Sequence, residues 1–301
     1  MIKDSALRLK MNYDKGDNIT IKEAQKMLGQ SELINKLLTP PERPSTTFVG
    51  LRAYMWRLLE LSEIPFSNTL DEVQKWVELL ANKSYIEEGF ALEGKRDNLL
   101  ACHNALITTI LIKMEYDDKE KIDAGINWIF DYQAVERGKK PKWTGKDLYT
   151  RFGGCMKSVP CYYGIVKSMI ALTEYKKRYE GPKKLEDTLK QGLEYILKHN
   201  VYKKLSSDKP IEDSIILNFY PYTYKSNVGE ILTLLKVNGL MGDERCNDAL
   251  KILKKKQRAD GYWQVDTSYM KSAWIDFDIP KKPGLWISYV IRKLVEEKIA
   301  L

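Results

Sequence analysis

The chain has 301 residues, of which 44% are hydrophobic and 30% charged, a balance that is typical of folded globular proteins and excludes a disordered or membrane-embedded chain. No apolar run reaches the roughly 18 to 20 residues that span a bilayer, and the N-terminal MIKDSALRLK lacks the apolar stretch of a secretory signal, so the sequence predicts a cytoplasmic protein with no transmembrane segment. Lysine and arginine outnumber aspartate and glutamate by 49 to 41, which favours anionic partners or only keeps the surface solvated, and the dispersed basic residues indicate no nucleic-acid-binding module.

Two kinds of helical segment alternate along the chain. The first pair is 20–38 as an outer helix and 47–61 as an inner helix. Amphipathic segments, with apolar residues at spacings of three and four and charges between them, then predict outer helices at 70–83, 118–133, 184–199 and 243–257. More apolar segments predict inner helices at 99–114, 160–175, 226–237 and 285–295. The repeat therefore predicts an all-α fold of five to six helical hairpins, with 1–45 as an N-terminal helical extension and 46–301 as the main domain.

Loop lengths give this repeat a direction. Each inner helix is joined to the following outer helix by a short turn, whereas the connections from outer to inner helices are long: 84–97, 134–159, 200–225 and 258–284. Alternation of the helices then places the long loops and the N-termini of the inner helices on one rim. A helix N-terminus offers unpaired N–H groups and the positive end of the helix dipole, so we expect this rim to receive an anionic ligand group.

The most specific local signature is the run from Gln257 to Trp263, QRADGYW, at the end of the last outer segment. It matches the Q-x3-G-x-W motif of squalene and hopene cyclases, and a weaker copy starts at 128–133 and is broken by an insertion that runs to Trp143. We expect a structural role, in which the Gln amide closes helix-terminal backbone groups, Gly allows a tight exit and Trp covers the end of the hairpin.

Together with the repeat, this motif makes residues 45–298 resemble the squalene cyclase and protein prenyltransferase family. The chain is most similar to a bacterial and archaeal branch of cyclase-like proteins, over Glu115 to Gln133, Cys155 to Leu172, Tyr195 to Lys203, Phe219 to Leu235 and Asp243 to Trp286. The resemblance implies an α/α toroid, a barrel of helical hairpins. It also implies an apolar, isoprenoid or lipid-like ligand in a central cavity, with an anionic head as one option.

The catalytic motifs of that family are missing. Cyclases that protonate an alkene use D-x-D-D, whereas Asp117 and Asp118 are typical of a helix start. Cyclases that ionise a diphosphate use D-D-x-x-D, and Lys121 stands where the last carboxylate is needed. Protein prenyltransferases bind zinc through Asp, Cys and His of late hairpins, where this chain offers only Cys246 and no His. The resemblance therefore leaves both the reaction and the question of enzymatic activity open.

Three cysteines and one histidine predict a different metal site. Cys102 lies at the start of an inner helix, Cys155 and Cys161 lie before and at the start of the next, and His199 ends an outer helix that runs toward the same rim. Three thiolates and one imidazole suit tetrahedral zinc. Two alternatives stay open, because free cysteine is commonly a small buried hydrophobe, and because His103 is a rival to His199, although its neighbour Cys102 points about 100° away on a helix.

Side chains near the starts of the inner helices are the candidate ligand contacts. In terpene cyclases aromatic walls shape the isoprenoid and stabilise cationic carbon. The predicted contacts here are Asn104, Tyr162, Tyr163, Tyr222, Tyr224, Trp274 and Trp286. The alternative is that these aromatic residues pack the core with their polar atoms directed to water.

Two functions of different classes follow. The first is a cyclase-like or prenyltransferase-like protein that binds an isoprenoid or lipid-like ligand in a central cavity. The second is a non-catalytic toroid module, stabilised by zinc, that binds a protein or peptide, and the missing acid motifs favour it. A pocket of several hundred cubic ångströms between the inner helices separates the two hypotheses.

Overall fold

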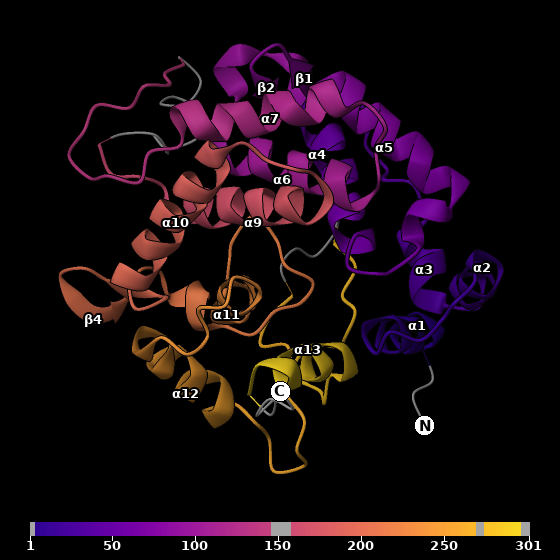
Figure 1. Ribbon diagram of the computed structural model, residues 1–301. Helices are drawn as coiled ribbons and strands as arrows, with labels where there is room; N and C mark the ends of the chain where they lie inside the picture. The colour runs from indigo at the N-terminus through magenta and orange to yellow at the C-terminus, as the bar shows by residue number, and fades with distance from the viewer. Residues whose placement is uncertain (1–3, 146–157, 269–273, 296–301) are drawn as a thin grey trace.

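The computed structural model describes residues 4–145, 158–268 and 274–295, and this part of the chain is predominantly helical (Figure 1). The inner helices are α4 (Phe48–Leu61), α6 (Ala101–Lys113), α9 (Tyr162–Arg178), α11 (Val228–Val237) and α13 (Leu285–Val295). The outer helices are α5 (Asp71–Ser84), α7 (Lys119–Tyr132), α10 (Lys183–Lys198) and α12 (Asn247–Lys255). The predicted alternation of apolar and amphipathic helices is confirmed, to within a few residues at each end.

The inner helices contact one another in chain order. α4 packs on α6, α6 on α9, α9 on α11, and α11 on α13, while α5, α7, α10 and α12 follow one another around the outside (Figure 1). Two glycines allow outer helices to approach closely. A Cβ atom on Gly125 would lie 2.2 Å from Thr108 Oγ1, and one on Gly192 would lie 2.1 Å from Met169 Sδ. The outer helices α7 and α10 therefore pack closely against side chains of α6 and α9.

The N-terminal extension is helical, as expected, but 20–38 forms two helices rather than one. The extension contains α1 (Ser5–Asp14), α2 (Ile21–Gly29) and α3 (Glu32–Leu37). Ser31 begins α3 by accepting a hydrogen bond from the Ile34 amide, which separates α3 from α2. At the end of α1, Asp14 accepts hydrogen bonds from Tyr289 and Lys293 of α13. The first and last helices of the chain are thereby joined.

Short strands and 3-10 turns in the connections between the helices were not expected from the sequence. β1 (Tyr85–Ile86) pairs with β2 (Gly89–Phe90), and β3 (Lys203–Lys204) pairs with β4 (Ser207–Pro210), each in an antiparallel hairpin. The 3-10 turns are η1 (Ser67–Thr69), η2 (Leu92–Gly94), η3 (Arg96–Asn98), η4 (Asp213–Ile216) and η5 (Glu244–Cys246). Strands of two to four residues are too short to show an alternating pattern.

The QRADGYW run has the expected structural role, with its parts distributed differently. Trp263 is fully buried, and its indole N–H donates to the Leu253 carbonyl in α12 at 2.7 Å, so tryptophan rather than glutamine closes the helix end. The Gln257 amide donates to the Gly261 carbonyl at 3.2 Å, and Gly261 has a φ of 79°, which favours glycine. The run therefore fixes the exit from α12.

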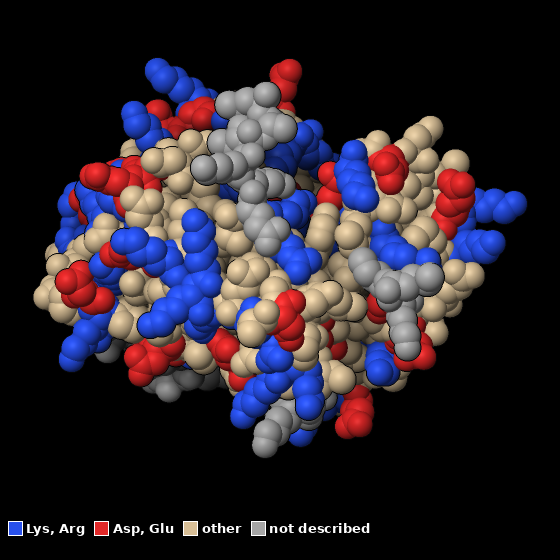
Figure 2. Space-filling model, turned by 90° about the horizontal axis from the view of Figure 1, so that it is seen from below, with Lys and Arg blue, Asp and Glu red and all other residues tan. Residues whose placement is uncertain are grey.

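The length of the helices and the charges on the surface bear on two further expectations from the sequence. None of the described helices combines the length and apolar character needed to cross a membrane. On the face seen from below, Lys and Arg side chains are interspersed with Asp and Glu (Figure 2).

Candidate ligand-binding site

A cavity of about 1040 Å³ lies where the C-terminal ends of α4, α6, α9 and α11 meet α1 and α13. We call it the large cavity. It lies at the rim of the short inner-to-outer turns, and Tyr220 and Tyr222 of the long connection 200–225 also reach it. We expected the functional side at the other rim, so the position of this cavity differs from the expectation.

The lining of the large cavity combines apolar, tyrosine and charged side chains. The apolar residues are Ile21, Ile64, Pro65, Phe66, Ile112, Met114, Val237, Val290 and Leu294. The tyrosines are Tyr13, Tyr220, Tyr222 and Tyr289. The basic residues are Lys10, Lys113, Lys177, Arg178, Lys236 and Lys293, and the acidic ones are Asp14, Glu63, Glu115 and Glu174. Six cations thus face four carboxylates.

Glu63 is the centre of a charged cluster in this lining. It follows the end of α4, where Lys113, the last residue of α6, donates to it at 2.8 Å and the Tyr220 hydroxyl donates at 3.0 Å. Burial alone would raise the pKa of Glu63, but Lys113 and Lys10 outweigh burial and hold the pKa at about 2. The carboxylate is therefore ionised at any physiological pH.

The two lysines of this cluster differ from each other. Burial would lower the pKa of Lys113, but Glu63 outweighs it, and the pKa is raised. For Lys10 burial prevails over the attraction of Glu63 and Asp14, and its pKa is lowered. An additional negative charge near Lys10 would stabilise its protonated form. An acidic ligand near Lys10 would therefore add to the attraction of Glu63 and Asp14.

A second charged pair lies within the inner helices. Lys167 of α9 donates to Glu230 of α11, at 2.6 Å to Oε2, and both side chains are buried. Burial lowers the pKa of Lys167 and raises that of Glu230, in each case against the attraction of the partner. Burial, together with the charge of Glu230, raises the pKa of Tyr222, which lines the large cavity. The pair therefore interacts electrostatically with a residue of the cavity lining.

The predicted ligand contacts are divided between several places. Tyr222 lines the large cavity, and its ring packs against that of Tyr220 at 5.3 Å. Trp286 is buried and lies 6.2 Å from the same Tyr220 ring, and Trp274 is also buried. Tyr224 instead lines a smaller pocket at the opposite rim. The structure therefore brings Tyr222 and Trp286 together around Tyr220 and separates them from Tyr224.

Three other predicted contacts have hydrogen bonds to the protein itself. Asn104 accepts from the Phe90 amide and donates to the Gly125 carbonyl, both at 2.9 Å, so it ties β2 to α7. Tyr162 donates to the Val201 carbonyl, and Tyr163 donates to Glu212 at 3.0 Å.

The metal prediction meets only part of its ligand set, because Cys155 lies outside the described residues. Cys161 precedes α9, where its Sγ accepts from the Gly164 amide at 3.4 Å, and Cys102 lies in the first turn of α6. Among the described residues no group of three or more His, Cys, Asp or Glu side chains is placed to hold a metal ion. The four-ligand zinc site therefore stays a prediction.

The two histidines differ in their surroundings. His199 is buried between the rings of Tyr162 and Tyr195, at 5.1 and 5.0 Å, and its Nδ1 is 2.7 Å from the Lys203 carbonyl. Its Nε2 has no hydrogen bond within the described part of the chain. His103 is also buried, and burial, with a contribution from Arg52, lowers its pKa to about 3.

The N-termini of the inner helices are partly occupied by side chains of the chain itself. Thr47 at α4, Cys161 at α9 and Asn227 at α11 each accept from one first-turn amide, and Asp278 at α13 accepts from three. No side chain of the described residues caps α6, so only some of the N–H groups that we expected to be unpaired are occupied.

The charged cluster of the large cavity was not predicted from the sequence, although a signal was present. Lys167 and Glu230 interrupt the apolar stretches IVKSMIAL and VGEILTLL, and Lys113 ends an apolar helix. A buried charge needs a partner, so isolated charges in apolar segments point to one another.

Comparison with protein-family models, with curated proteins and with solved structures found no match for the chain. Its function is therefore argued from the geometry of the two cavities.

Proposed function

We propose that the chain is an α/α toroid whose large cavity binds an apolar, isoprenoid or lipid-like molecule with an acidic head. Support for the toroid comes from the sequential contacts of the inner helices and from the bonds that join α1 to α13. The observation that carries the ligand is the large cavity itself. Its volume of about 1040 Å³ is slightly above the range for small-molecule sites, roughly 300 to 1,000 Å³, and is large enough for a long-chain ligand.

The composition of the lining selects the kind of ligand. Nine apolar residues and four tyrosines offer contact to a hydrocarbon chain, and the six basic residues outnumber the four acidic ones by two. A pure hydrocarbon would remove water from the basic side chains without offering them an acceptor, which is unfavourable. An acidic head accepts hydrogen bonds from these cations, and the rest of the molecule covers the apolar walls.

Native mass spectrometry of the purified protein, followed by solvent extraction, tests this proposal. We expect a retained lipid-like mass that is lost in Val290→Trp, which fills the large cavity, and kept in Ile279→Trp, a matched change at a residue that is 72% exposed. Titration with farnesyl phosphate, oleate and the neutral farnesol provides a direct measurement. The acidic compounds should bind at least tenfold more tightly than farnesol. No retained lipid together with no binding of the three probes would refute the proposal.

A zinc-stabilised toroid module that binds a protein or peptide is the second proposal, and the geometry of His199 favours its metal. A carbonyl only accepts, so Nδ1 carries the proton and Nε2 carries the lone pair, as in most metal-binding histidines. The ligand set requires Cys155 as well. Elemental analysis should find about one zinc per chain, reduced in His199→Gln and Cys161→Ser and unchanged in His103→Gln. Protein free of zinc after purification without chelators would exclude this site.

A further inference from the structure

One of the six basic side chains in the large cavity differs from the other five in its hydrogen bonds. The other five each donate to an acceptor of the chain itself. These acceptors are Glu63 for Lys113, Glu174 for Lys177, the Ile112 carbonyl for Arg178, the Lys293 carbonyl for Lys236 and Asp14 for Lys293. Lys10 has no hydrogen bond to any residue that the structure describes. Its N–H donors are therefore available to a ligand.

The carboxylate nearest to Lys10 already has other donors. Asp14 Oδ2 accepts from the Tyr289 hydroxyl at 2.8 Å and from Lys293 at 3.0 Å. Lys10 Nζ lies 3.9 Å from the same oxygen, which is too long for a hydrogen bond. The Lys10 side chain is nevertheless only 18% exposed, so water reaches little of it. An ammonium group that is largely buried requires an acceptor, and a ligand in the cavity can supply one.

The charges that act on Lys10 leave one positive charge unbalanced. Its pKa is lowered, because burial outweighs the attraction of Glu63 and Asp14 and because Lys113 and Lys293 also lower it. This group therefore contains three lysines and two carboxylates. One added negative charge would balance the group and favour the protonated form of Lys10.

This balance also selects the charge of the ligand head. A carboxylate carries one negative charge at neutral pH, whereas a phosphate monoester carries roughly 1.5 to 2. The second charge of a phosphate would meet Glu63, whose pKa of about 2 keeps it ionised, and the nearby Asp14. Repulsion between partly buried like charges is screened little by salt. The group therefore favours a single carboxylate over a phosphate.

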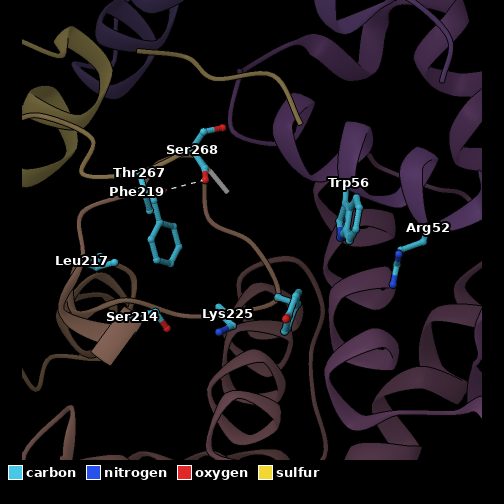
Figure 3. A pocket seen from close by; sticks show the side chains of 9 residues that line it. Arg52, Trp56, Ser214, Leu217, Phe219, Lys225, Thr267 and Ser268 are labelled. Carbon is cyan, nitrogen blue, oxygen red and sulfur yellow. Dashed lines mark hydrogen bonds between the residues drawn. The ribbon is translucent and has the colours of Figure 1, made fainter. Parts of the chain in front are cut away.

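The lysine of the smaller pocket at the long-loop rim shows the opposite situation (Figure 3). Lys225 lines that pocket, whose volume is about 490 Å³, and donates to Glu212. The charge of Lys225 is thus matched by a carboxylate of the chain within hydrogen-bond distance, as the charge of Lys10 is not.

We propose that the ligand of the large cavity is an apolar chain that ends in one carboxylate, and that Lys10 donates to this carboxylate. The inference rests on the proposed function and narrows its acidic head to a single class. Lys10 belongs to α1, whereas much of the apolar lining belongs to the ends of inner helices. A bound acid would therefore also hold α1 against the cavity.

Decanoate, decyl phosphate and decan-1-ol are the probes, because they share one chain and differ in the head. By isothermal titration calorimetry at about pH 7.5, decanoate should bind at least about tenfold more tightly than decan-1-ol and more tightly than decyl phosphate. At about pH 5.5 the difference between the two acids should shrink. The phosphate loses its second charge near pH ~6, while Glu63 stays ionised.

Lys10→Met removes the charge and keeps the length of the side chain. Decanoate should then bind at least about fivefold more weakly, whereas the affinity for decan-1-ol should change by less than about twofold. Lys15→Met is the matched control, because Lys15 is exposed, directly follows α1 and does not line the large cavity. This variant should bind both probes as the wild type does.

Hydrogen exchange of the wild-type protein keeps the test decisive if Lys10→Met fails to fold. Decanoate should slow exchange in α1 more than in α12, which does not line the large cavity, and more than decan-1-ol slows it in α1. A smaller loss in Lys10→Met than about fivefold, or no protection of α1, would overturn the role of Lys10. Decyl phosphate that binds as tightly as decanoate at about pH 7.5 would overturn the carboxylate. Failure of all three probes to bind would instead contradict the proposed function itself.

Discussion

Replacement of Lys113 by methionine removes the nearest cation from Glu63 and keeps the length of the side chain. A pKa lowered from 4.5 to about 2 corresponds to roughly 3 kcal/mol of stability at neutral pH, at ~1.4 kcal/mol for each tenfold change in proton affinity. Lys10 and Tyr220 share this stabilisation, and Lys113 is 26% exposed. We therefore expect Lys113→Met to lose roughly 2 to 3 kcal/mol, below the ~3 to 5 kcal/mol for a fully buried pair.

The pH dependence has a definite sign. A carboxylate with a lowered pKa contributes its full stability above about pH 4.5 and loses it as the pH falls toward 2. Urea unfolding of wild type and Lys113→Met at several pH values should thus show a difference that is largest at pH 7 and shrinks below pH 4.5. Lys75→Met is the matched control, because Lys75 is 72% exposed and pairs with Glu72 at 3.5 Å, so we expect a change within about 0.5 kcal/mol. A loss below about 1 kcal/mol at pH 7, or one that does not vary with pH, would refute this reasoning.

Three further predictions concern buried groups. Lys167→Met should lose roughly 3 to 5 kcal/mol of stability in urea unfolding, because Glu230 is left as a buried unpaired charge. The double variant Lys167→Met with Glu230→Leu should lie within about 1 kcal/mol of wild type. Losses that add up in the double variant would contradict the pairing. Trp263→Phe should lose about 0.5 to 1.5 kcal/mol, since the Leu253 carbonyl in α12 loses the indole donor and keeps the Lys256 amide at 3.2 Å, and thermal unfolding measures this. The Asp278 carboxylate accepts from three amides at the start of α13, so Asp278→Asn should destabilise this helix by about 1 to 2 kcal/mol. Hydrogen exchange at the Trp286 amide should be faster than in wild type, and unchanged exchange would contradict the cap.

The helices could be predicted from the sequence because their signals are local. The spacing of apolar residues determines which face is buried, and a polar residue before the apolar run marks the start. Asp118 illustrates this, since it begins α7 by accepting from the Lys121 amide at 3.2 Å, as a helix-start residue does. Such information is contained in a few consecutive residues and needs no knowledge of the rest of the fold.

The position of the candidate site could not be predicted in the same way. Glu63, Lys113 and Tyr220 lie up to 157 residues apart and meet only when the inner helices are side by side. The expectation of an anion site at the opposite rim assumes that the N–H groups at the helix N-termini are unpaired. Asn227, which caps α11 by accepting from the Glu230 amide at 3.0 Å, shows why this assumption fails. Side chains close by in the sequence already accept hydrogen bonds from some of the amides that we expected to bind a ligand.

Buried charges in the inner helices also bear on the choice between the two proposed functions. Well-packed apolar residues are commonly at least as stabilising as a buried ion pair in the same place. Stability alone therefore does not account for Lys167 and Glu230. A purely structural role at these positions is served as well by leucine. The charge of Glu230 instead acts on Tyr222, which lines the large cavity, and Glu63 of the charged cluster acts on Glu230. Polar groups at that depth are useful to a protein that recognises an acidic head inside its cavity, and they give no advantage to a module that binds a partner only at its surface.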